Sequence, residues 1–489
     1  MTTQLEDFDV SKSAIRGTAW QYIAIFSGKL MVFISTVILA RLLTKDDFGL
    51  VGYAVTIITF LEGSSDLGVT SAVIYYPENK TRVSTSFWIN QITGLLYFIA
   101  VWVSAPFIAE YFRDERVVAV TRVLAFTFPL LALGNVHERV LLKRLSFKKG
   151  FIPPFLRAIA KGGFSIGFAF VGFGAWSLIL GQLTGTLVSS IAYWVVTPWR
   201  PSFEFDFTMA KELLGYGTKF VLGEVIAIIL FNIDYVLVGR YLGSEQLGVY
   251  MLAFRMPDLI ILEFARTLSN VLFPIYSQLR EQTDDMSHTF FLATRYISLL
   301  TIPMGIGLVL VAHPFVLVFF TEKWIELVPV MKAITIFSTL LSIVHNASSV
   351  YWAQGKPQIP TWIALARLFI LLPLLFWAVT ISKSIIIVAW VQVFVALFAV
   401  SLNFIVASRF IGIAPSSILK ALTPAITSSG FMSIIVYFII SIWGSMLMPW
   451  LLLILCVLIG GISYLLALWF LDRDIVLSAH RQILSALRK

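Results

Sequence analysis

The segments Ile370–Val379, ILLPLLFWAV, and Leu451–Ile459, LLLILCVLI, decide the fold, because neither contains a charged residue or alternates apolar with polar residues. A transmembrane β-strand alternates in this way over about 10 residues, whereas a transmembrane helix needs about 20 mostly apolar residues. Backbone polar groups in lipid must be hydrogen-bonded within the protein, so only helices and closed barrels span a bilayer. These continuous apolar blocks therefore predict membrane-spanning α-helices.

The composition extends this prediction to the whole chain. Of the 489 residues, 58% are hydrophobic and 13% are charged, whereas soluble domains contain about 25% charged residues. This difference excludes a water-soluble enzyme of the same length. The single cysteine, Cys456, lies in an apolar run, so no intrachain disulfide is expected. A polar N-terminus followed by a long apolar run does not fit a cleavable signal peptide.

The apolar blocks and the polar breaks between them predict an all-α, polytopic membrane protein with about fourteen transmembrane helices. The predicted spans are 18–40, 48–76, 86–111, 117–142, 152–172, 175–197, 216–239, 247–275, 288–312, 325–353, 359–380, 384–408, 421–443 and 448–471. The predicted parts are a cytoplasmic N-terminal segment (1–17), an N-lobe of helices 1–6 (18–197), a cytoplasmic inter-lobe linker (198–215), a C-lobe of helices 7–12 (216–410), two extra helices (411–471) and a cytoplasmic amphipathic tail (472–489).

The distribution of Lys and Arg predicts the orientation. With the N-terminus taken as cytoplasmic, the inner connections contain eighteen Lys and Arg residues and the outer connections contain seven. The short Lys143–Lys149 loop alone contributes four of the eighteen. An excess of positive charge marks the cytoplasmic side, so both termini are expected there. These loops also account for the net charge of +9, and no nucleic-acid partner is predicted.

An internal repeat is present. Val37–Ala54, VILARLLTKDDFGLVGYA, aligns without gaps to Val236–Ala253, VLVGRYLGSEQLGVYMLA. Arg41 aligns with Arg240 and Gly49 with Gly248, an offset of 199 residues that contains six predicted spans. Because six is even, the two copies have the same membrane orientation. Parallel six-helix halves of this kind occur in several transporter folds. Chance similarity between short membrane connections is the alternative interpretation.

Ionisable residues within the predicted spans mark candidate functional positions, since such residues usually face a bundle interior or an aqueous cavity. Lys29 lies near the middle of the first span, and Glu62 and Asp66 share one helical face of the second. In the eighth span, Arg266 falls on a stripe that also contains Arg255, Asp258 and Ser269, with Glu263 at its edge. The basic residues toward the cytoplasmic side are Arg157 and Lys161 of the fifth span, Arg295 of the ninth and Arg367 of the eleventh.

Structural roles compete with these functional ones. Lys29 can form an ion pair with Glu62 or Asp66, Arg266 can pair locally with Glu263, and Arg157 and Lys161 can extend to the membrane interface. The five histidines show no metal-ligand spacing, and the sequence contains no HExxH, CxxC or nucleotide P-loop motif. We therefore expect no metal, no cofactor and no direct use of ATP. Energy is then expected from ion or substrate gradients.

Several motifs resemble those of a known family. They are ARLLTKDDFGLV (Ala40–Val51), SDLGVTSAVI (Ser65–Ile74), LLKRLSFKKG (Leu141–Gly150), LGVYMLAFRMP (Leu247–Pro257), VLFPIYSQL (Val271–Leu279), FTEKWIELVPVMKAI (Phe320–Ile334) and QGKP (Gln354–Pro357). Together they resemble the Wzx-like polysaccharide exporters of the multidrug/oligosaccharidyl-lipid/polysaccharide superfamily, a branch that includes colanic acid and teichuronic acid flippases.

The resemblance implies a flippase of the bacterial inner membrane that works by alternating access. Its implied substrate is an oligosaccharide linked to undecaprenyl pyrophosphate, and its other implied partners are membrane lipids and the polysaccharide polymerase or export machinery. A pyrophosphate needs cations, and arginine can bind phosphate through two parallel donors. The candidate pyrophosphate ligands are Lys29, Arg157, Lys161, Arg266, Arg295 and Arg367. Proton or sodium coupling is associated with the superfamily, which makes Glu62, Asp66 and Glu263 candidate ion-coupling residues.

Three alternatives stay open at this point. A multidrug exporter or a lipid II flippase of the same superfamily would have the same architecture, although cationic drugs favour an acidic cavity rather than a basic one. A membrane glycosyltransferase or polymerase would be an enzyme, and many such enzymes carry a large outer loop that is not visible here.

Overall fold

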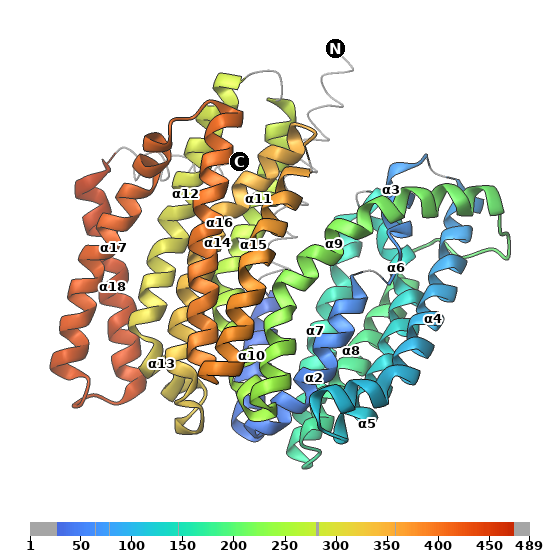
Figure 1. Cartoon of the computed structure of the whole chain (residues 1–489), viewed down its shortest axis with the longest axis horizontal. Coiled ribbons are helices and arrows are strands. Elements are labelled where there is room, and N and C mark those ends of the chain that lie inside the picture. The colour runs from blue at the N-terminus through green and yellow to red at the C-terminus, as the bar shows by residue number, and fades with distance from the viewer. Residues whose placement is uncertain are drawn as a thin grey trace. The chain divides into compact units, whose positions relative to one another are not determined.

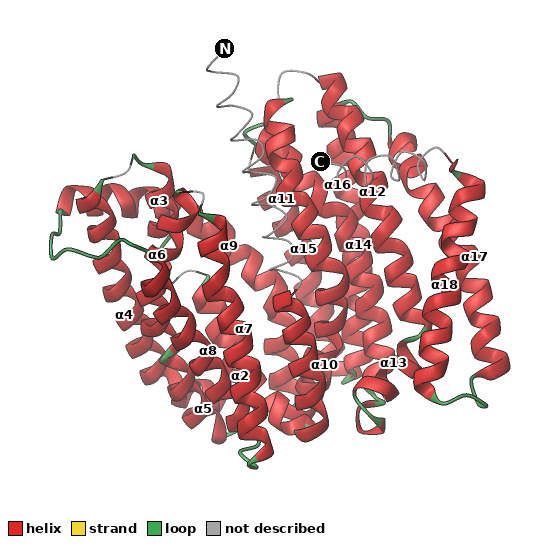
Figure 2. Cartoon of the chain, turned by 180° about the vertical axis from the view of Figure 1, so that it is seen from behind, coloured by secondary structure: helices red, strands yellow, loops and turns green. Residues whose placement is uncertain are grey.

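The computed structural model describes residues 27–63, 65–77, 79–144, 146–279, 283–356 and 358–473. Every regular element within these ranges is a helix (Figure 2), which confirms the predicted all-α fold. The predicted N-terminal segment 1–17, and the predicted amphipathic tail from residue 474 onward, lie outside the described residues.

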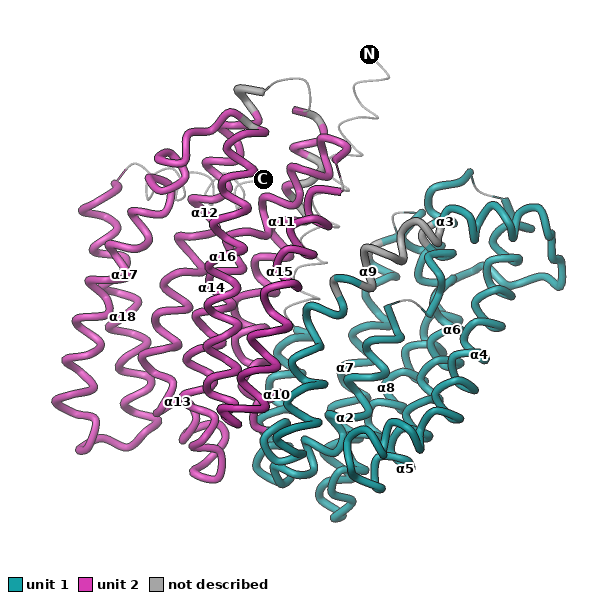
Figure 3. The backbone as a smooth tube through the Cα atoms, viewed as in Figure 1, with its two compact units in different colours: residues 1–248 teal, residues 249–489 magenta. Residues whose placement is uncertain are grey.

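The chain divides into two compact units, Met1–Gly248 and Val249–Lys489, which Figure 3 distinguishes by colour. Unit 1 contains a helix over residues 27–42, α2 (Lys45–Glu62), α3 (Val69–Tyr75), α4 (Lys80–Phe112), α5 (Arg116–Ala125), α6 (Thr127–Lys143), α7 (Phe147–Phe170), α8 (Ala175–Val196) and α9 (Phe207–Leu242). The next helix, α10 (Ser244–Pro257), begins in unit 1 and ends in unit 2.

Unit 2 contains the remaining helices, which Figure 1 colours from yellow-green to red. They are the π-helical turn η1 (Asp258–Leu262), α11 (Glu263–Gln278), α12 (Thr283–Leu310), α13 (Ala312–Phe319), η2 (Glu322–Trp324), α14 (Leu327–Ala353), α15 (Gln358–Trp377), η3 (Ala378–Ser382), α16 (Ile385–Ile411), α17 (Pro415–Trp443) and α18 (Pro449–Leu471). The units divide at Gly248 because α9 packs against α2, α3 and α4. The two lobes predicted from the internal repeat, 18–197 and 216–410, and the linker between them, 198–215, stay predictions.

Within the described residues, nine helices are long and apolar enough to cross a membrane by length and composition. They correspond to the predicted spans that begin at 86, 117, 175, 288, 325, 359, 384, 421 and 448. Four of the other five predicted spans contain the candidate charges Lys29, Glu62, Lys161 and Arg266, and charged side chains lower the hydropathy of a helix. The total of fourteen spans therefore stays a prediction.

Local sequence signals explain where several helices begin. Thr44 and Asp47 form a capping box before α2, in which the Asp47 amide donates to Thr44 Oγ1 at 3.1 Å and the Thr44 amide donates to Asp47 Oδ2 at 2.9 Å. Asn79 and Asp206 accept hydrogen bonds from the first amides of α4 and α9 in the same manner. These caps pair backbone donors that the helices leave without intrahelical partners.

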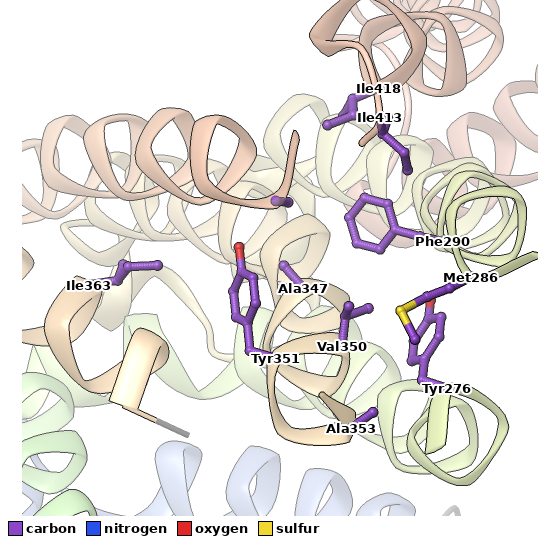
Figure 4. Packing of buried hydrophobic residues seen from close by; sticks show 11 residues of the cluster. Tyr276, Met286, Phe290, Ala347, Val350, Tyr351, Ala353, Ile363, Ile413 and Ile418 are labelled. Atoms are coloured by element: carbon purple, nitrogen blue, oxygen red, sulfur yellow. The ribbon is translucent and has the colours of Figure 1, made fainter. Parts of the chain in front are cut away.

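A buried hydrophobic cluster forms part of the interior of unit 2 (Figure 4). Tyr276 and Tyr351 are fully buried, and their hydroxyl groups donate to Asn346 Oδ1 at 2.8 Å and to the Asn403 carbonyl at 3.1 Å. Buried tyrosines usually have such partners, since an unmet hydroxyl is costly in an apolar interior. Tyr276 thereby joins α11 to α14, and Tyr351 joins α14 to α16.

Asp46 forms an ion-pair network in the connection that precedes the predicted second span. Arg116 donates from Nη1 to Asp46 Oδ2 at 2.6 Å and from Nη2 to Asp46 Oδ1 at 3.0 Å, and the Ser244 hydroxyl also donates to Asp46. The hydrogen bonds from Arg116 hold the pKa of the Asp46 carboxyl below its ordinary value, against the opposing effect of partial burial.

We expect this network to make stability depend on pH. A carboxyl whose pKa is lower in the folded state stabilises the protein above its unfolded pKa, and that contribution is lost as the pH falls through the folded pKa. Asp46→Asn should therefore lower the melting temperature of detergent-solubilised protein at pH 7, and the difference from wild type should shrink in acid. The effect should be small, because Arg116 is 53% exposed. A difference that grows on acidification would contradict this assignment.

Candidate functional site

The predicted second span is two helices in the structure rather than one. Helix α2 ends at Glu62, and α3 begins at Val69 after Leu67 and Gly68, which have φ values of 49° and 69°. The prediction that Glu62 and Asp66 share a face of one continuous helix is therefore wrong, because the chain turns between them. Asp66 instead accepts from the Gly68 amide at 2.9 Å and from the Thr70 hydroxyl, contacts that stabilise the start of α3.

Glu62 belongs to a charged cluster in unit 1. The cations that act on its carboxylate are Arg157 and Lys161, which lie one turn apart on α7. The Oε1 atom of Glu62 is buried and has no hydrogen-bond partner within the described residues. Arg157 also lies 3.4 Å from the hydroxyl of Thr186 on α8. Two predicted pyrophosphate ligands and one predicted ion-coupling residue therefore lie in one electrostatic cluster.

Two glycines on α8 position the basic turn of α7. A methyl group at Gly185 would lie 3.0 Å from the Arg157 carbonyl oxygen, and one at Gly181 would lie 2.9 Å from the Lys161 carbonyl oxygen. Small residues four apart allow transmembrane helices to pack this closely. This spacing is visible in the sequence, although the sequence does not show which helix it faces.

The corresponding cluster of unit 2 is centred on Arg266 of α11. Its guanidinium lies 3.2 Å from Glu263 Oε1 and 3.4 Å from Asp258 Oδ1, and its side chain is 36% exposed. Asp258 begins the π-helical turn η1, which joins α10 to α11, and such turns are frequent at functional sites. The local pair of Arg266 with Glu263 is thus present, and Asp258 is a second partner.

Arg367 of α15 and His345 of α14 extend this cluster. Arg367 is only 6% exposed, and its guanidinium lies 5.5 Å from the ring centre of Phe337 on α14. His345 interacts electrostatically with Arg266, Glu263 and Arg367. The contact that Arg367 makes between α15 and α14 is the one with Phe337. His345 was missed by the sequence analysis, although a histidine within a predicted span is itself a signal.

Arg295 of α12 lies in a separate ion pair. Its guanidinium contacts the carboxylate of Asp472, the residue that follows α18. The guanidinium also lies 5.9 Å from the ring centre of Phe291. The sequence analysis gave no signal for this pair, because 177 residues separate the two partners. Arg295 thus joins α12 to the end of α18, and its predicted contact with a pyrophosphate stays a prediction.

Lys29 lies within the described helical residues 27–42, and its predicted pairing with Glu62 or Asp66 stays a prediction. The roles of all six cationic and all three acidic candidates also stay predictions. Within the described ranges, no three His, Cys, Asp or Glu side chains gather as a metal-binding group would require. The two clusters combine guanidinium or ammonium groups with carboxylates, which suits them to bind an anion and to exchange a proton.

Comparison with protein families gives a match over more than half of the chain. Residues 38–329 match the family described as polysaccharide biosynthesis protein. The teichuronic acid biosynthesis protein TuaB of Bacillus subtilis is 26% identical over 391 residues, which cover 79% of this chain and 80% of the relative. The succinoglycan biosynthesis transport protein ExoT of Rhizobium meliloti is 26% identical over 361 residues, which cover 73% of this chain and 72% of that protein.

Solved transporters share the fold. The lipid II flippase MurJ, in an inward closed conformation, matches with a TM-score of 0.76 and 16% identity, over 94% of this chain and 100% of that one. An inward-facing multidrug resistance transporter of the MATE family matches with a TM-score of 0.62 and 16% identity, over 80% of this chain and 96% of that one. These findings confirm the resemblance to polysaccharide exporters and the prediction of a transporter rather than an enzyme. The chain belongs to the polysaccharide biosynthesis protein family, as a multi-pass membrane transporter.

Proposed function

We propose that this protein moves an oligosaccharide linked to undecaprenyl pyrophosphate from the inner to the outer leaflet of the bacterial inner membrane. The polar head group crosses through the protein by alternating access, while the lipid tail stays in the bilayer. The names of the relatives support a role in building surface polysaccharides. The Lys and Arg asymmetry supports cytoplasmic termini and a substrate site that first opens to the cytoplasm.

The observation that carries this proposal is the pair of arginines in the helices of unit 2: Arg266 of α11, which is ion-paired with Glu263 and Asp258, and Arg367 of α15, which is buried beside Phe337 of α14. Guanidinium groups within membrane helices are costly and usually serve a substrate or ion pathway. Arginine binds pyrophosphate oxygens through two parallel donors, so the pair suits an anionic head group. Arg157 and Lys161 form a second candidate contact in unit 1, and Lys29 and Arg295 complete the proposed set.

Proton or sodium coupling is part of the proposal, with Glu62, Asp66 and Glu263 as the ion-coupling residues. Each carboxylate has a structural neighbour that its protonation would affect. Protonated Glu62 would no longer attract Arg157 and Lys161, and protonated Glu263 would loosen its hold on Arg266. A carboxylate that competes with the substrate for an arginine can thereby link substrate binding to an ion gradient. The polysaccharide polymerase or export machinery would receive the product at the outer face.

A proteoliposome assay tests the function directly. The probe is a short-chain polyprenyl pyrophosphoryl oligosaccharide that carries a fluorophore on the sugar and is present in both leaflets. A membrane-impermeant reductant then destroys fluorescence in the outer leaflet only. We expect the purified full-length protein to make nearly all of the probe accessible, while a fluorophore-labelled phospholipid stays half protected. Movement of both lipids, or export of a cationic drug without movement of the probe, would contradict the proposal.

A further inference from the structure

The connection between α8 and α9 carries three phenylalanines that alternate with two carboxylates. Its sequence from Arg200 to Phe207 is RPSFEFDF. Phe203 is 92% exposed, Phe207 is 83% exposed and Phe205 is 38% exposed. Single exposed apolar side chains are common on protein surfaces, whereas neighbouring ones mark an interaction site. Three exposed phenyl rings within five residues therefore need an explanation in a segment that the sequence predicts to be a cytoplasmic linker.

Hydrogen bonds hold this connection against the first turns of α4, so its exposed rings have defined positions. The bonds run from the Thr81 hydroxyl to Glu204 Oε2 at 2.8 Å, from the Ser202 amide to Ser84 Oγ at 3.1 Å, from the Asp206 amide to Thr85 Oγ1 at 3.1 Å and from Trp88 Nε1 to the Ser202 carbonyl at 2.8 Å. The polar groups of the connection are thus bonded to α4, while Phe203 and Phe207 are left on the surface.

Helix α4 indicates the depth of this connection in the bilayer. Its exposed apolar side chains recur at helical spacing, at Ile92, Leu96, Ile99, Val103 and Phe107. Trp88 precedes this lipid-facing stripe by four residues, and Tyr111 follows it by four. The 23 positions from Trp88 to Tyr111 span about 34 Å at 1.5 Å per residue, slightly more than a hydrocarbon core of about 30 Å. Tryptophan and tyrosine concentrate at the two membrane interfaces, so Trp88 marks one of them.

Phe203 continues the stripe of α4 at this depth. Its ring stacks on Trp88, with the ring centres 5.5 Å apart and the planes 24° apart. Phe207 opens α9, and the bond from Asp206 to Thr85 keeps that helix start near the same turn of α4. The charges of the connection do not favour an anionic surface, because residues 200–212 contain two basic and three acidic side chains. Burial of the phenyl rings is therefore the driving force.

We propose that Phe203, Phe205 and Phe207 form a membrane anchor, which inserts into the boundary between head groups and acyl chains in the leaflet where α4 begins. The predicted orientation makes this the cytoplasmic leaflet. The partner is the lipid itself, since the rings continue a lipid-facing stripe at interfacial depth. The connection between the two repeats is then an interfacial element that holds the start of α9 at the membrane surface. A protein partner would instead require these rings to face water in the isolated transporter.

Spin-label accessibility tests the anchor in full-length protein reconstituted into lipid nanodiscs. Cys456→Ala removes the single cysteine, and a nitroxide is attached to Phe203→Cys or Phe207→Cys in that background. Leu96→Cys, 58% exposed on the stripe of α4, is the lipid control. Lys148→Cys, exposed near the start of α7, is the aqueous control. The readout is the ratio of collisions with oxygen, which concentrates in lipid, to collisions with a water-soluble nickel chelate.

We expect the ratio at both phenylalanine positions to shift from that of Lys148→Cys toward that of Leu96→Cys. The shift should be the same in phosphatidylcholine alone and with added phosphatidylglycerol, because apolar burial does not depend on lipid charge. Ratios equal to the aqueous control would overturn the proposal and leave the rings for a protein partner. A shift that appears only with phosphatidylglycerol would also contradict it.

A measurement on wild type keeps the proposal testable if a cysteine variant fails to fold. An apolar aryl diazirine dissolved in the bilayer is activated by light, and mass spectrometry locates its adducts. We expect adducts within residues 203–207 and on the exposed stripe of α4, with none at Lys148 or Lys149. Labelling of the stripe without labelling of residues 203–207 would overturn the anchor. Neither experiment uses the oligosaccharide substrate, so failure of the anchor leaves the proposed function standing.

Discussion

Gly49→Ala is expected to prevent most of the protein from folding. A methyl group at Gly49 would lie 1.8 Å from the carbonyl oxygen of Ser244 and 2.8 Å from its Cα atom. Both atoms belong to the backbone, so a side-chain rotation cannot relieve the overlap. The cost should reach or exceed about 3 kcal/mol, the upper end for an overpacked site. The measurement is the yield and the melting temperature of detergent-extracted protein.

Gly248→Ala should have a similar effect, since its methyl group would lie 2.2 Å from the Lys45 carbonyl oxygen. The matched control is Gly163→Ala on α7, where an added methyl group has no heavy atom of another described element within 4 Å. Alanine is also the better helix former, so this control should retain or slightly raise stability. Normal yield and melting temperature for Gly49→Ala would show that α2 and α10 do not cross in this manner.

The contact between α2 and α10 is symmetric with respect to the internal repeat. An offset of 199 residues aligns Gly49 with Gly248, and the same offset aligns Lys45 with Ser244. In the structure, the glycine of each copy packs against the backbone of the residue four positions before the glycine of the other copy. The two motifs thus form a reciprocal contact, and their origin in one repeated unit stays a prediction.

The sequence predicted helices well because hydrophobic length decides them. A continuous apolar run such as Leu451–Ile459 is stable in a bilayer as a helix, because a helix pairs all of its backbone polar groups internally. Helix α18 contains this run, as predicted. The break between α2 and α3 was missed because Glu62 and Asp66 fit a helical face in sequence. The pattern does not reveal that Asp66 instead bonds Gly68 and Thr70.

The part of the candidate site that the sequence did not predict depends on contacts between residues far apart in the chain. The sequence identified Arg266 from its depth in a predicted span and Arg367 as a basic residue toward the cytoplasmic side of the eleventh span. The contact of Arg367 with Phe337 depends on how α15 packs against α14. The same holds for Arg116, whose partner Asp46 lies 70 residues away. Charge and periodicity identify which residues are costly to bury, whereas only the packing shows which of them meet.

Arg266→Ala is expected to nearly abolish transport of the lipid-linked oligosaccharide. The guanidinium is 36% exposed and is held by Glu263 and Asp258 at 3.2 Å and 3.4 Å, so it is positioned before any substrate arrives. Pyrophosphate oxygens can replace these carboxylates as acceptors, and the planar guanidinium then offers two parallel donors.

Substitutions at Arg266 separate binding from folding. Arg266→Lys keeps the charge but supplies a single compact donor group, so transport should fall while the protein yield stays near wild type. Arg266→Ala also leaves Glu263 and Asp258 without their cation, and the double variant Arg266→Ala/Glu263→Gln should recover yield without recovering transport.

Lys420→Ala, on the exposed side of α17, is the control for loss of a positive charge. The readouts are the lipid-linked intermediate that accumulates on the cytoplasmic face and the detergent-extracted yield. Full transport by a well-expressed Arg266→Ala protein would remove Arg266 from the mechanism. If Arg266 served only as an ion-pair partner of Glu263, its loss would affect folding and would not stop transport by the protein that does fold.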